Sequence, residues 1–210
     1  MPAPVRIPEA HPADAALLAQ WARTMADETE GLQLDAGTVL AGVEQGIADP
    51  SKARYFVAVR EVPLAGDEVI AEPVGMLMLT SEWSDWRCGH WWWIQSVYVT
   101  PAHRRGGVFR ALYAHVHALA AARAEVVGLR LYVERGNAAA KAAYASLGTH
   151  AAGYHILAAA ARAADSARSP PPPPRKRPCR KSTYGRLRAH GLRPASRDTA
   201  GQRPVHVKAA

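Results

Sequence analysis

Hydrophobic residues recur with two different periods along the first 157 residues, and these periods predict a mixture of helices and strands. Apolar positions three and four residues apart predict an amphipathic helix from Pro12 through Met25 and a second helix over Asp35–Ile47. A short edge strand is expected at Val5–Pro8. The acidic stretch Asp27–Leu32 is expected to form a loop between the two helices.

Three strands are predicted in the middle of the chain. Tyr55–Arg60 and Val74–Thr80 are expected to pair antiparallel, and the second is apolar on both faces, which is typical of a central strand. Ser81–His90 is expected to connect it to Trp91–Thr100, which is rich in aromatic and β-branched residues. These segments predict a continuous sheet.

Helix and strand alternate in the following 50 residues. A helix is predicted by an apolar stripe at helical spacing, which consists of Val108, Phe109, Leu112, Val116 and Leu119. Val127–Val133 alternates with period two, which predicts a strand parallel to the one before this helix. Asn137 as N-cap and Gly148 after the C-terminus bound a last helix, and Gly153–Leu157 is expected as a final short strand. This order indicates an α/β fold with a mixed sheet.

Charge divides the 210 residues into two parts near residue 158. Residues 1–157 contain 13 Lys and Arg against 16 Asp and Glu, whereas residues 158–210 contain 13 against 2, so the net charge of +8 comes from the tail. We expect one globular domain over 1–157 and a disordered Pro/Arg-rich basic tail over 158–210. The tail is interpreted as a nucleic-acid or anionic-surface arm, a dispensable extension, or the product of a shifted reading frame.

Cysteine content and hydropathy bear on the location of the protein. Cys88 and Cys179 lie in different parts of the chain, which predicts neither a disulfide framework nor a metal site. No stretch reaches the roughly 18 consecutive apolar residues of a membrane span, and the N-terminus lacks the features of a signal peptide. We therefore expect a soluble cytoplasmic protein without a metal ion or membrane contact.

A basic turn between a strand and a helix is the most informative feature of the sequence. It lies within residues 93–112, WIQSVYVTPAHRRGGVFRAL. The first N–H groups of a helix have no intrahelical partner, and together with the helix dipole they bind phosphate. Gly106 and Gly107 are followed by Val108 rather than by Lys and Ser or Thr, so the turn is not a Walker loop. The spacing of a Rossmann fingerprint is also missing.

Two motifs lie about 30 residues apart in this region. The first, R-x-x-G-x-F, is formed by Arg104, Gly107 and Phe109. The second, N-x-x-A-x-x-x-Y-x-x-x-G, is formed by Asn137, Ala140, Tyr144 and Gly148. Across residues 5–157 the chain resembles the GNAT superfamily of acetyl-CoA-dependent N-acetyltransferases, whose first motif ends in Gly or Ala where this chain has Phe109. We expect the Phe109 side chain to point into the core between helix and sheet.

The resemblance implies a fold and a cofactor site. It implies a mostly antiparallel central sheet with one parallel, splayed strand pair and flanking helices. The pantetheine arm of acetyl-CoA would lie along Val97, Tyr98 and Val99, between the splayed strands. Backbone N–H groups of the turn would hold the pyrophosphate. The further cofactor contacts that it implies are Arg104, Arg105, Gly106, Gly107, Val108, Phe109, Arg110, Asn137 and Tyr144.

The resemblance also implies roles in the direct attack of a primary amine on the thioester. Tyr144 would be the general acid that protonates the leaving thiolate, and the Val97 backbone N–H would polarise the thioester carbonyl. Gln95 stands where many relatives have a glutamate, and an amide cannot accept the proton of the amine. A water or a carboxylate must then act as base, and the carboxylate candidates are Glu28, Glu30, Glu82 and Asp85.

The acceptor and the assembly stay open at this level. A polyamine, an aminoglycoside, an amino acid, or a peptide or protein amine could accept the acetyl group, and the protein could be a monomer or a homodimer.

Two other functions compete with the interpretation of the protein as an enzyme. A non-catalytic acyl-CoA-binding or regulatory domain would keep the cofactor site and lose the acid, so Tyr144 favours an enzyme. A nucleic-acid-associated protein would depend on the tail alone.

Overall fold

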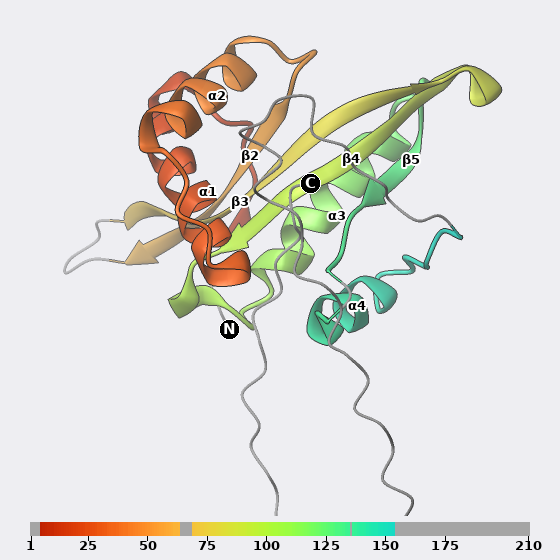
Figure 1. Cartoon of the computed structure of the whole chain (residues 1–210). Coiled ribbons are helices and arrows are strands. Elements are labelled where there is room, and N and C mark those ends of the chain that lie inside the picture. The colour runs from red at the N-terminus through yellow and green to blue at the C-terminus, as the bar shows by residue number, and fades with distance from the viewer. Residues whose placement is uncertain (1–4, 64–68, 135, 154–210) are drawn as a thin grey trace, which may run out of the picture. The chain divides into compact units, whose positions relative to one another are not determined.

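Five strands of the described chain form one sheet, in the order β1-β2-β3-β4-β5 (Figure 1). The computed structural model describes residues 5–63, 69–134 and 136–153, and the sheet and its helices lie within residues 5–149. The strands are β1 (Val5–Arg6), β2 (Arg54–Pro63), β3 (Val69–Ser84), β4 (Gly89–Val99) and β5 (Val126–Leu131). Neighbours pair antiparallel except β4 and β5, which are parallel. The predicted α/β fold is confirmed.

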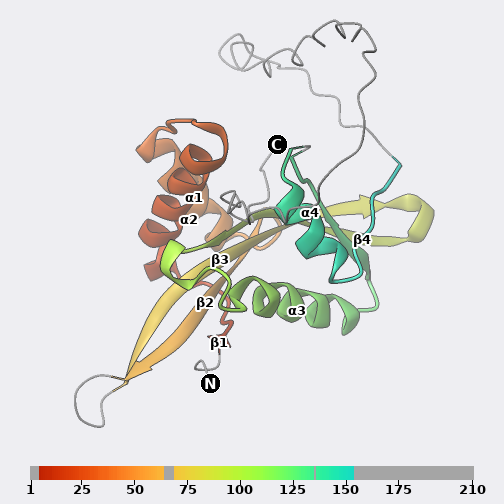
Figure 2. The same cartoon turned by 90° about the horizontal axis from the view of Figure 1, so that it is seen from below.

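Helices cover both faces of the sheet. They are α1 (Ala15–Glu30), α2 (Ala36–Ala48), α3 (Val108–Ala121) and α4 (Ala138–Ala145). α1 and α2 lie on one face, where α2 contacts β2 and α1 contacts β4, and α3 lies on the other (Figures 1 and 2). α4 follows β5, beyond the end of that strand (Figure 1). The predicted strand at 153–157 and the predicted tail over 158–210 fall outside the described residues, apart from Gly153.

The acidic stretch after Met25 is helical, and the prediction of a loop there was wrong. α1 continues through Glu30 and ends at Gly31, whose φ of +64° is the left-handed conformation that glycine adopts easily. The Gly31 N–H donates to the Asp27 carbonyl at 2.9 Å, and the Leu32 N–H donates to that of Ala26 at 3.3 Å. The glycine, rather than the acidic composition, sets the helix end.

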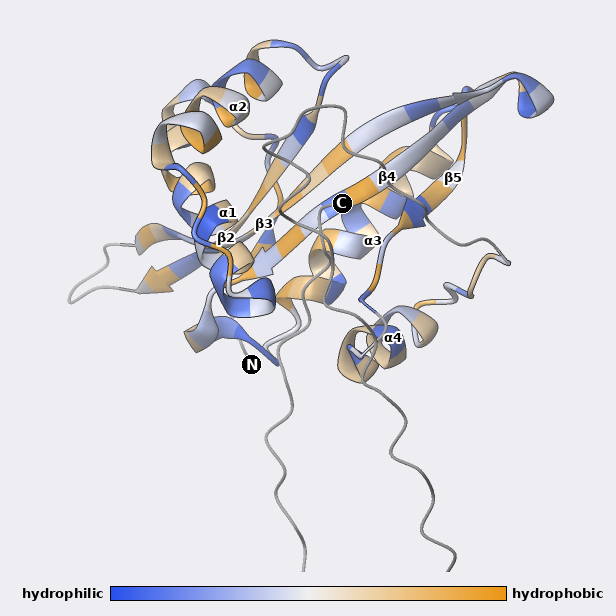
Figure 3. Ribbon diagram, viewed as in Figure 1, coloured by the Kyte–Doolittle hydropathy of each residue, from blue (hydrophilic) through white to orange (hydrophobic). Residues whose placement is uncertain are grey.

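The β3–β4 hairpin is longer than the apolar pattern predicts. The expected connection Ser81–His90 is mostly paired strand, because β3 continues to Ser84 and β4 begins at Gly89. A short 3₁₀ turn, Asp85–Arg87, joins them. No described helix covers this end of the sheet, so its residues need not be apolar. Figure 3 shows the change along β3 and β4 from a hydrophobic middle to a hydrophilic hairpin end.

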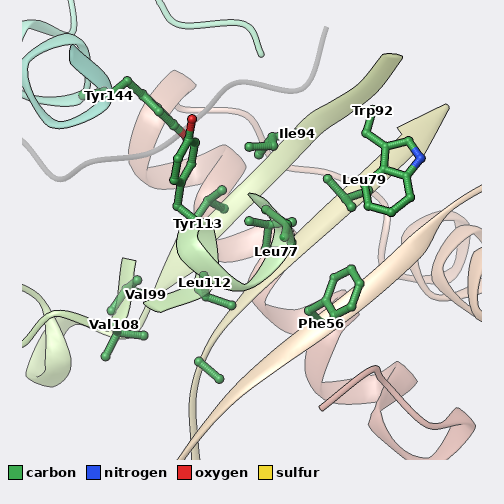
Figure 4. Packing of buried hydrophobic residues seen from close by; sticks show 14 of the residues in the cluster. Phe56, Leu77, Leu79, Trp92, Ile94, Val99, Val108, Leu112, Tyr113 and Tyr144 are labelled. Atoms are coloured by element: carbon green, nitrogen blue, oxygen red, sulfur yellow. The ribbon is translucent and has the colours of Figure 1, made fainter. Parts of the chain in front are cut away.

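A bulge in β4 changes which residues face each helix layer. Met78 lies opposite Ser96 while Leu79 lies opposite Ile94, so Gln95 is an extra residue in the strand. Alternation therefore shifts by one, and the β4 side chains in the core with α3 are Trp92, Ile94, Val97 and Val99. Figure 4 labels Trp92, Ile94 and Val99 among them. A second core under α1 and α2 includes Tyr98.

Close strand contact in this sheet requires glycine at position 75. A Cβ on Gly75 would lie 2.7 Å from the backbone carbonyl oxygen of Tyr98. We expect Gly75→Ala to lower the free energy of unfolding by about 1–3 kcal/mol, because backbone must move to admit the methyl group. Gly42→Ala is the matched control, since nothing lies within 4 Å of its Cβ, and it should add about 0.5–1 kcal/mol. Urea unfolding of both variants measures the two effects, and equal shifts would contradict the steric argument.

Candidate active site

The parallel strands β4 and β5 separate halfway along β4. Their pairing runs from His90 opposite Val126 to Ile94 opposite Leu131, and β4 continues to Val99 paired with β3 only. β5 ends at Leu131, and the chain then leads to α4. Figure 1 shows the two strands diverging at this point. The predicted splayed pair is present, and the Gln95 bulge lies where it begins.

The backbone of Val97 faces this gap. In an antiparallel ladder, alternate residues exchange hydrogen bonds with the partner strand. The Thr100 N–H donates to the Val74 carbonyl at 3.0 Å, so Thr100 and Tyr98 bond toward β3. The alternate residues Val97 and Val99 direct their N–H and carbonyl groups to the other side, where β5 has ended. Val97 therefore offers a donor to the gap between the strands.

The strand ends in a turn that opens α3. Residues 101–103 form a 3₁₀ turn, Arg105 has a φ of +63°, and Gly107 has a φ of +82° at the N-cap of α3. No side chain caps this helix, so the N–H groups of its first turn, from Val108, Phe109 and Arg110, lack intrahelical partners. The predicted anion-binding residues form one helix N-terminus at the end of β4.

Arg104 joins this turn to α1. Its Nε donates to the Val99 carbonyl at 3.0 Å, and its Nη2 donates to Glu28 Oε2 at 2.6 Å. The guanidinium also lies over the Tyr98 ring, with its carbon 5.7 Å from the ring centroid. Burial of the ring and the Glu28 carboxylate raise the pKa of Tyr98, with burial the larger cause. The fold thus brings Glu28 to the turn, although 76 residues separate it from Arg104.

Arg60 lies beneath the turn, and the sequence analysis missed it. Its guanidinium projects from β2 and donates a hydrogen bond to the Gly106 carbonyl. Its Nε is buried and has no hydrogen-bond partner among the described residues. The contact joins residues 46 positions apart. A single arginine within the apolar run FVAVREV was the signal that could have indicated it.

Tyr144 is buried in the core on the α3 side of the sheet. Its side chain is 3% exposed, and its hydroxyl has no hydrogen-bond partner in the described part of the chain. Burial, with a smaller contribution from Tyr113, raises the pKa of Tyr144 far above its ordinary value of 10.0. Val97 and Tyr144 belong to one core cluster, and Figure 4 shows Tyr144 reaching from α4 toward Tyr113.

The Phe109 side chain, which departs from the family motif, is accommodated in the core. Its side chain packs against the core, as predicted, with the ring edge-on to Tyr144 at 5.1 Å between centroids. The ring therefore packs between α3 and α4. Asn137 is the N-cap of α4, and its Oδ1 accepts from the Ala140 N–H at 2.9 Å.

The four carboxylates proposed as bases fall into two groups. Glu28 and Glu30 lie in the last turn of α1. Glu82 lies on β3, where its carboxylate accepts from Trp93 Nε1 and, at 3.0 Å, from Arg130 Nη1. Asp85 lies in the exposed hairpin turn and accepts from the Trp86 N–H at 2.9 Å. Eight residues of β4, or about 26 Å, separate the hairpin turn from Val97.

The residues of the gap fit the chemistry of an acyl-CoA. A splayed strand with outward N–H groups can pair with the amides of a pantetheine arm. The uncapped start of α3 and nearby arginines can bind a pyrophosphate. The buried, unpartnered Tyr144 hydroxyl is a donor that lacks an acceptor. Among the described residues, no group of three or more metal-ligating side chains occurs, and no helix is long and apolar enough to span a membrane.

Comparison with known proteins agrees with this geometry. Residues 18–149, more than half of the chain, match the model of the "Acetyltransferase (GNAT) family". A possible acetyltransferase from Clostridium difficile 630 is 36% identical over 74% of this chain and 97% of its own, with a TM-score of 0.65. No curated protein gave a significant match. The chain therefore belongs to the GNAT acetyltransferase family and is an acyltransferase.

More distant structures share the fold. The ribosomal-protein-alanine N-acetyltransferase of Brucella melitensis biovar Abortus 2308 is 18% identical over 75% of this chain and 99% of its own, with a TM-score of 0.56. The aminoglycoside N-acetyltransferase AAC(6')-Iy in complex with CoA is 12% identical over 77% of this chain and 98% of its own, with a TM-score of 0.59. At these identities the likeness concerns the fold.

Proposed function

We propose that the protein transfers an acetyl group from acetyl-CoA to a primary amine by direct attack on the thioester. The observation that carries the proposal is the separation of β4 from β5 at Ile94, which leaves the Val97 N–H directed into a gap. The turn at the end of β4 would hold the pyrophosphate. The CoA bound to the structural neighbour AAC(6')-Iy supports the same donor.

Two of the three chemical demands would be met by Val97 and Tyr144. Acetyl-CoA supplies the activated acyl group. The Val97 N–H would hydrogen-bond to the carbonyl oxygen as charge develops there. Tyr144 would donate a proton to the leaving sulfur, and burial, which raises its pKa, keeps its hydroxyl protonated until then. A non-catalytic acyl-CoA-binding domain has no need for such a buried, unpartnered hydroxyl.

Glu28 is the first carboxylate to consider as the base. The fold brings it to Arg104 at the cofactor turn, whereas Asp85 lies at the far end of the hairpin. A water between Glu28 and the amine would complete the proton transfer.

The exposed free thiol of Cys88 is consistent with a reducing compartment. A cytoplasmic location is therefore part of this proposal.

Acetyl-CoA is expected to stabilise the protein. At a concentration of about 100 times Kd, binding to the folded state alone adds about 2.7 kcal/mol to the free energy of unfolding. Thermal unfolding with and without acetyl-CoA measures this effect, and free-thiol release with an amine panel measures transfer. An unchanged melting temperature at saturating acetyl-CoA would refute the proposal.

A further inference from the structure

An aromatic and charged patch covers the sheet beside the splayed strands. Trp92 packs against α3, so its neighbours Trp91 and Trp93 lie on the opposite face, which also carries α1 and α2. Arg130 of β5 lies opposite Trp93 in the parallel pair. α1 packs on the other end of β4, where the centroid of the Trp21 ring lies 6.0 Å from that of Tyr98, and the two tryptophans and Arg130 remain half-buried.

Several contacts fix the guanidinium of Arg130. Its carbon lies 4.1 Å from the ring centroid of Trp91 and 5.6 Å from that of Trp93. Its Nη1 donates to Glu82 Oε1 at 3.0 Å, and Glu82 Oε2 accepts from Trp93 Nε1. Trp93 in turn stacks on Tyr132, with 4.4 Å between centroids. The arginine is therefore held in one orientation before any acceptor binds.

One edge of this guanidinium is left open. Within the described residues, the Nε–H and Nη2–H groups of Arg130 form no hydrogen bond, and the side chain is 35% exposed. Arg54 shows what this edge binds: its Nε and Nη2 donate to the two carboxylate oxygens of Glu9 at 2.9 and 3.0 Å. Two parallel donors match a carboxylate in both spacing and charge.

The same patch is poorly suited to a polycationic acceptor. Arg130 already lies over the Trp91 ring, and the Arg87 guanidinium lies 5.4 Å from its centroid. The Glu82 carboxylate is already paired with Arg130. A polyamine or aminoglycoside would therefore approach two arginines and a neutralised carboxylate.

We infer that Arg130 binds a carboxylate of the acceptor, so that the substrate is an amine that also carries a carboxylate, in the form of a short peptide. The inference rests on the proposed acetyl transfer, because it takes the Val97 N–H as the position of the reacting carbonyl. The guanidinium lies between the rings of Trp91 and Trp93, which precede Val97 by six and four residues, or about 13–20 Å along an extended strand. A single amino acid cannot span this distance, whereas three or four extended residues of about 11–14 Å, with a hydrogen bond of about 3 Å at each end, reach into this range.

A ladder of glycine peptides tests the charge and the spacing together. Glycine, diglycine, triglycine and tetraglycine are offered as free acids and as C-terminal amides, with acetyl transfer followed by thiol release. We expect kcat/KM to favour the acid over the amide at least tenfold for triglycine or tetraglycine, and less than twofold for glycine. In Arg130→Gln the acid-to-amide ratio should fall to within twofold of one, while KM for acetyl-CoA stays unchanged.

Two further variants separate recognition from structure. Arg87→Gln removes the other arginine beside Trp91 and should keep the wild-type ratio. Arg130→Lys keeps the charge and loses the two parallel donors, so its ratio should fall several-fold; it carries the test if Arg130→Gln does not fold.

The outcomes distinguish this inference from the proposed function. A ratio near one in the wild type at every length, a wild-type ratio in Arg130→Gln, or binding of acetyl-CoA without acetylation of any glycine peptide would each overturn the carboxylate assignment. Failure of acetyl-CoA to stabilise the wild-type protein would instead overturn the proposed acetyl transfer.

Discussion

Tyr144→Phe is expected to lower kcat about 10²- to 10³-fold while making the free protein slightly more stable. The hydroxyl is the proposed proton donor to the leaving sulfur, and loss of a positioned acid costs a rate factor of this order. It is also buried without a hydrogen-bond partner among the described residues, and an unsatisfied buried polar group costs about 1–3 kcal/mol. Thiol-release kinetics and urea unfolding without acetyl-CoA measure the two opposite effects.

The raised pKa of Tyr144 adds a prediction about pH. Burial keeps the hydroxyl protonated in the folded state well above pH 10, so its ionisation should not reduce kcat between pH 8 and pH 10. In the unfolded chain it loses its proton near the ordinary value of 10.0. Above about pH 10 the unfolded state therefore binds fewer protons than the folded state, and stability falls as pH rises. Tyr144→Phe should show a weaker fall.

Tyr113→Phe is the matched control for Tyr144→Phe. The Tyr113 hydroxyl lies 2.9 Å from Thr149 Oγ1, so its removal breaks a hydrogen bond and should lower the free energy of unfolding by about 1 kcal/mol. Its effect on kcat should be less than threefold. Wild-type kcat in Tyr144→Phe, or equal losses in both variants, would contradict the assignment of Tyr144 as the acid.

The elements that bury a regular apolar face could be predicted from the sequence. α3 follows its stripe closely, and Asn137 caps α4 as its type and position indicate. β5 occupies Val126–Leu131 against the predicted Val127–Val133, and all six of its residues are half-buried. The hairpin end of β3 escaped prediction because no described helix covers it, and the strand extends past Thr80 through pairing with β4 and cross-strand contacts such as that of Glu82 with Trp93. The end of α1 escaped prediction because Gly31, not the acidic residues before it, terminates the helix.

The site could be predicted only where it follows a local motif. The turn at Gly107 and the helix with Tyr144 each occupy a short, contiguous pattern. Arg60 and Arg130 meet their partners across 46 and 48 residues, and no local period records such a contact. The strand register decides which residues lie opposite each other, and it depends on how the strands pair rather than on any local segment of sequence.

Arg60→Met is expected to weaken the binding of CoA about 10- to 100-fold with little change in kcat at saturation. The guanidinium holds the Gly106 carbonyl from below, and this fixes the orientation of the peptide whose N–H groups follow in the turn. A hydrogen bond from a charged donor contributes about 1.5–3 kcal/mol. The positive charge of the guanidinium also favours a bound pyrophosphate. Titration calorimetry with CoA measures the change in Kd directly.

Two variants test whether the loss of CoA affinity depends on the position of the positive charge. Arg60→Lys retains a cation that can reach the same carbonyl, so it should recover most of the lost affinity. Arg54→Met removes an arginine from the same strand, six residues away and about 20 Å along it, where the side chain pairs with Glu9. It should leave Kd for CoA within twofold of the wild type. Equal losses in Arg60→Met and Arg54→Met would instead mean that β2 stability, and not the carbonyl contact under the turn, limits CoA binding.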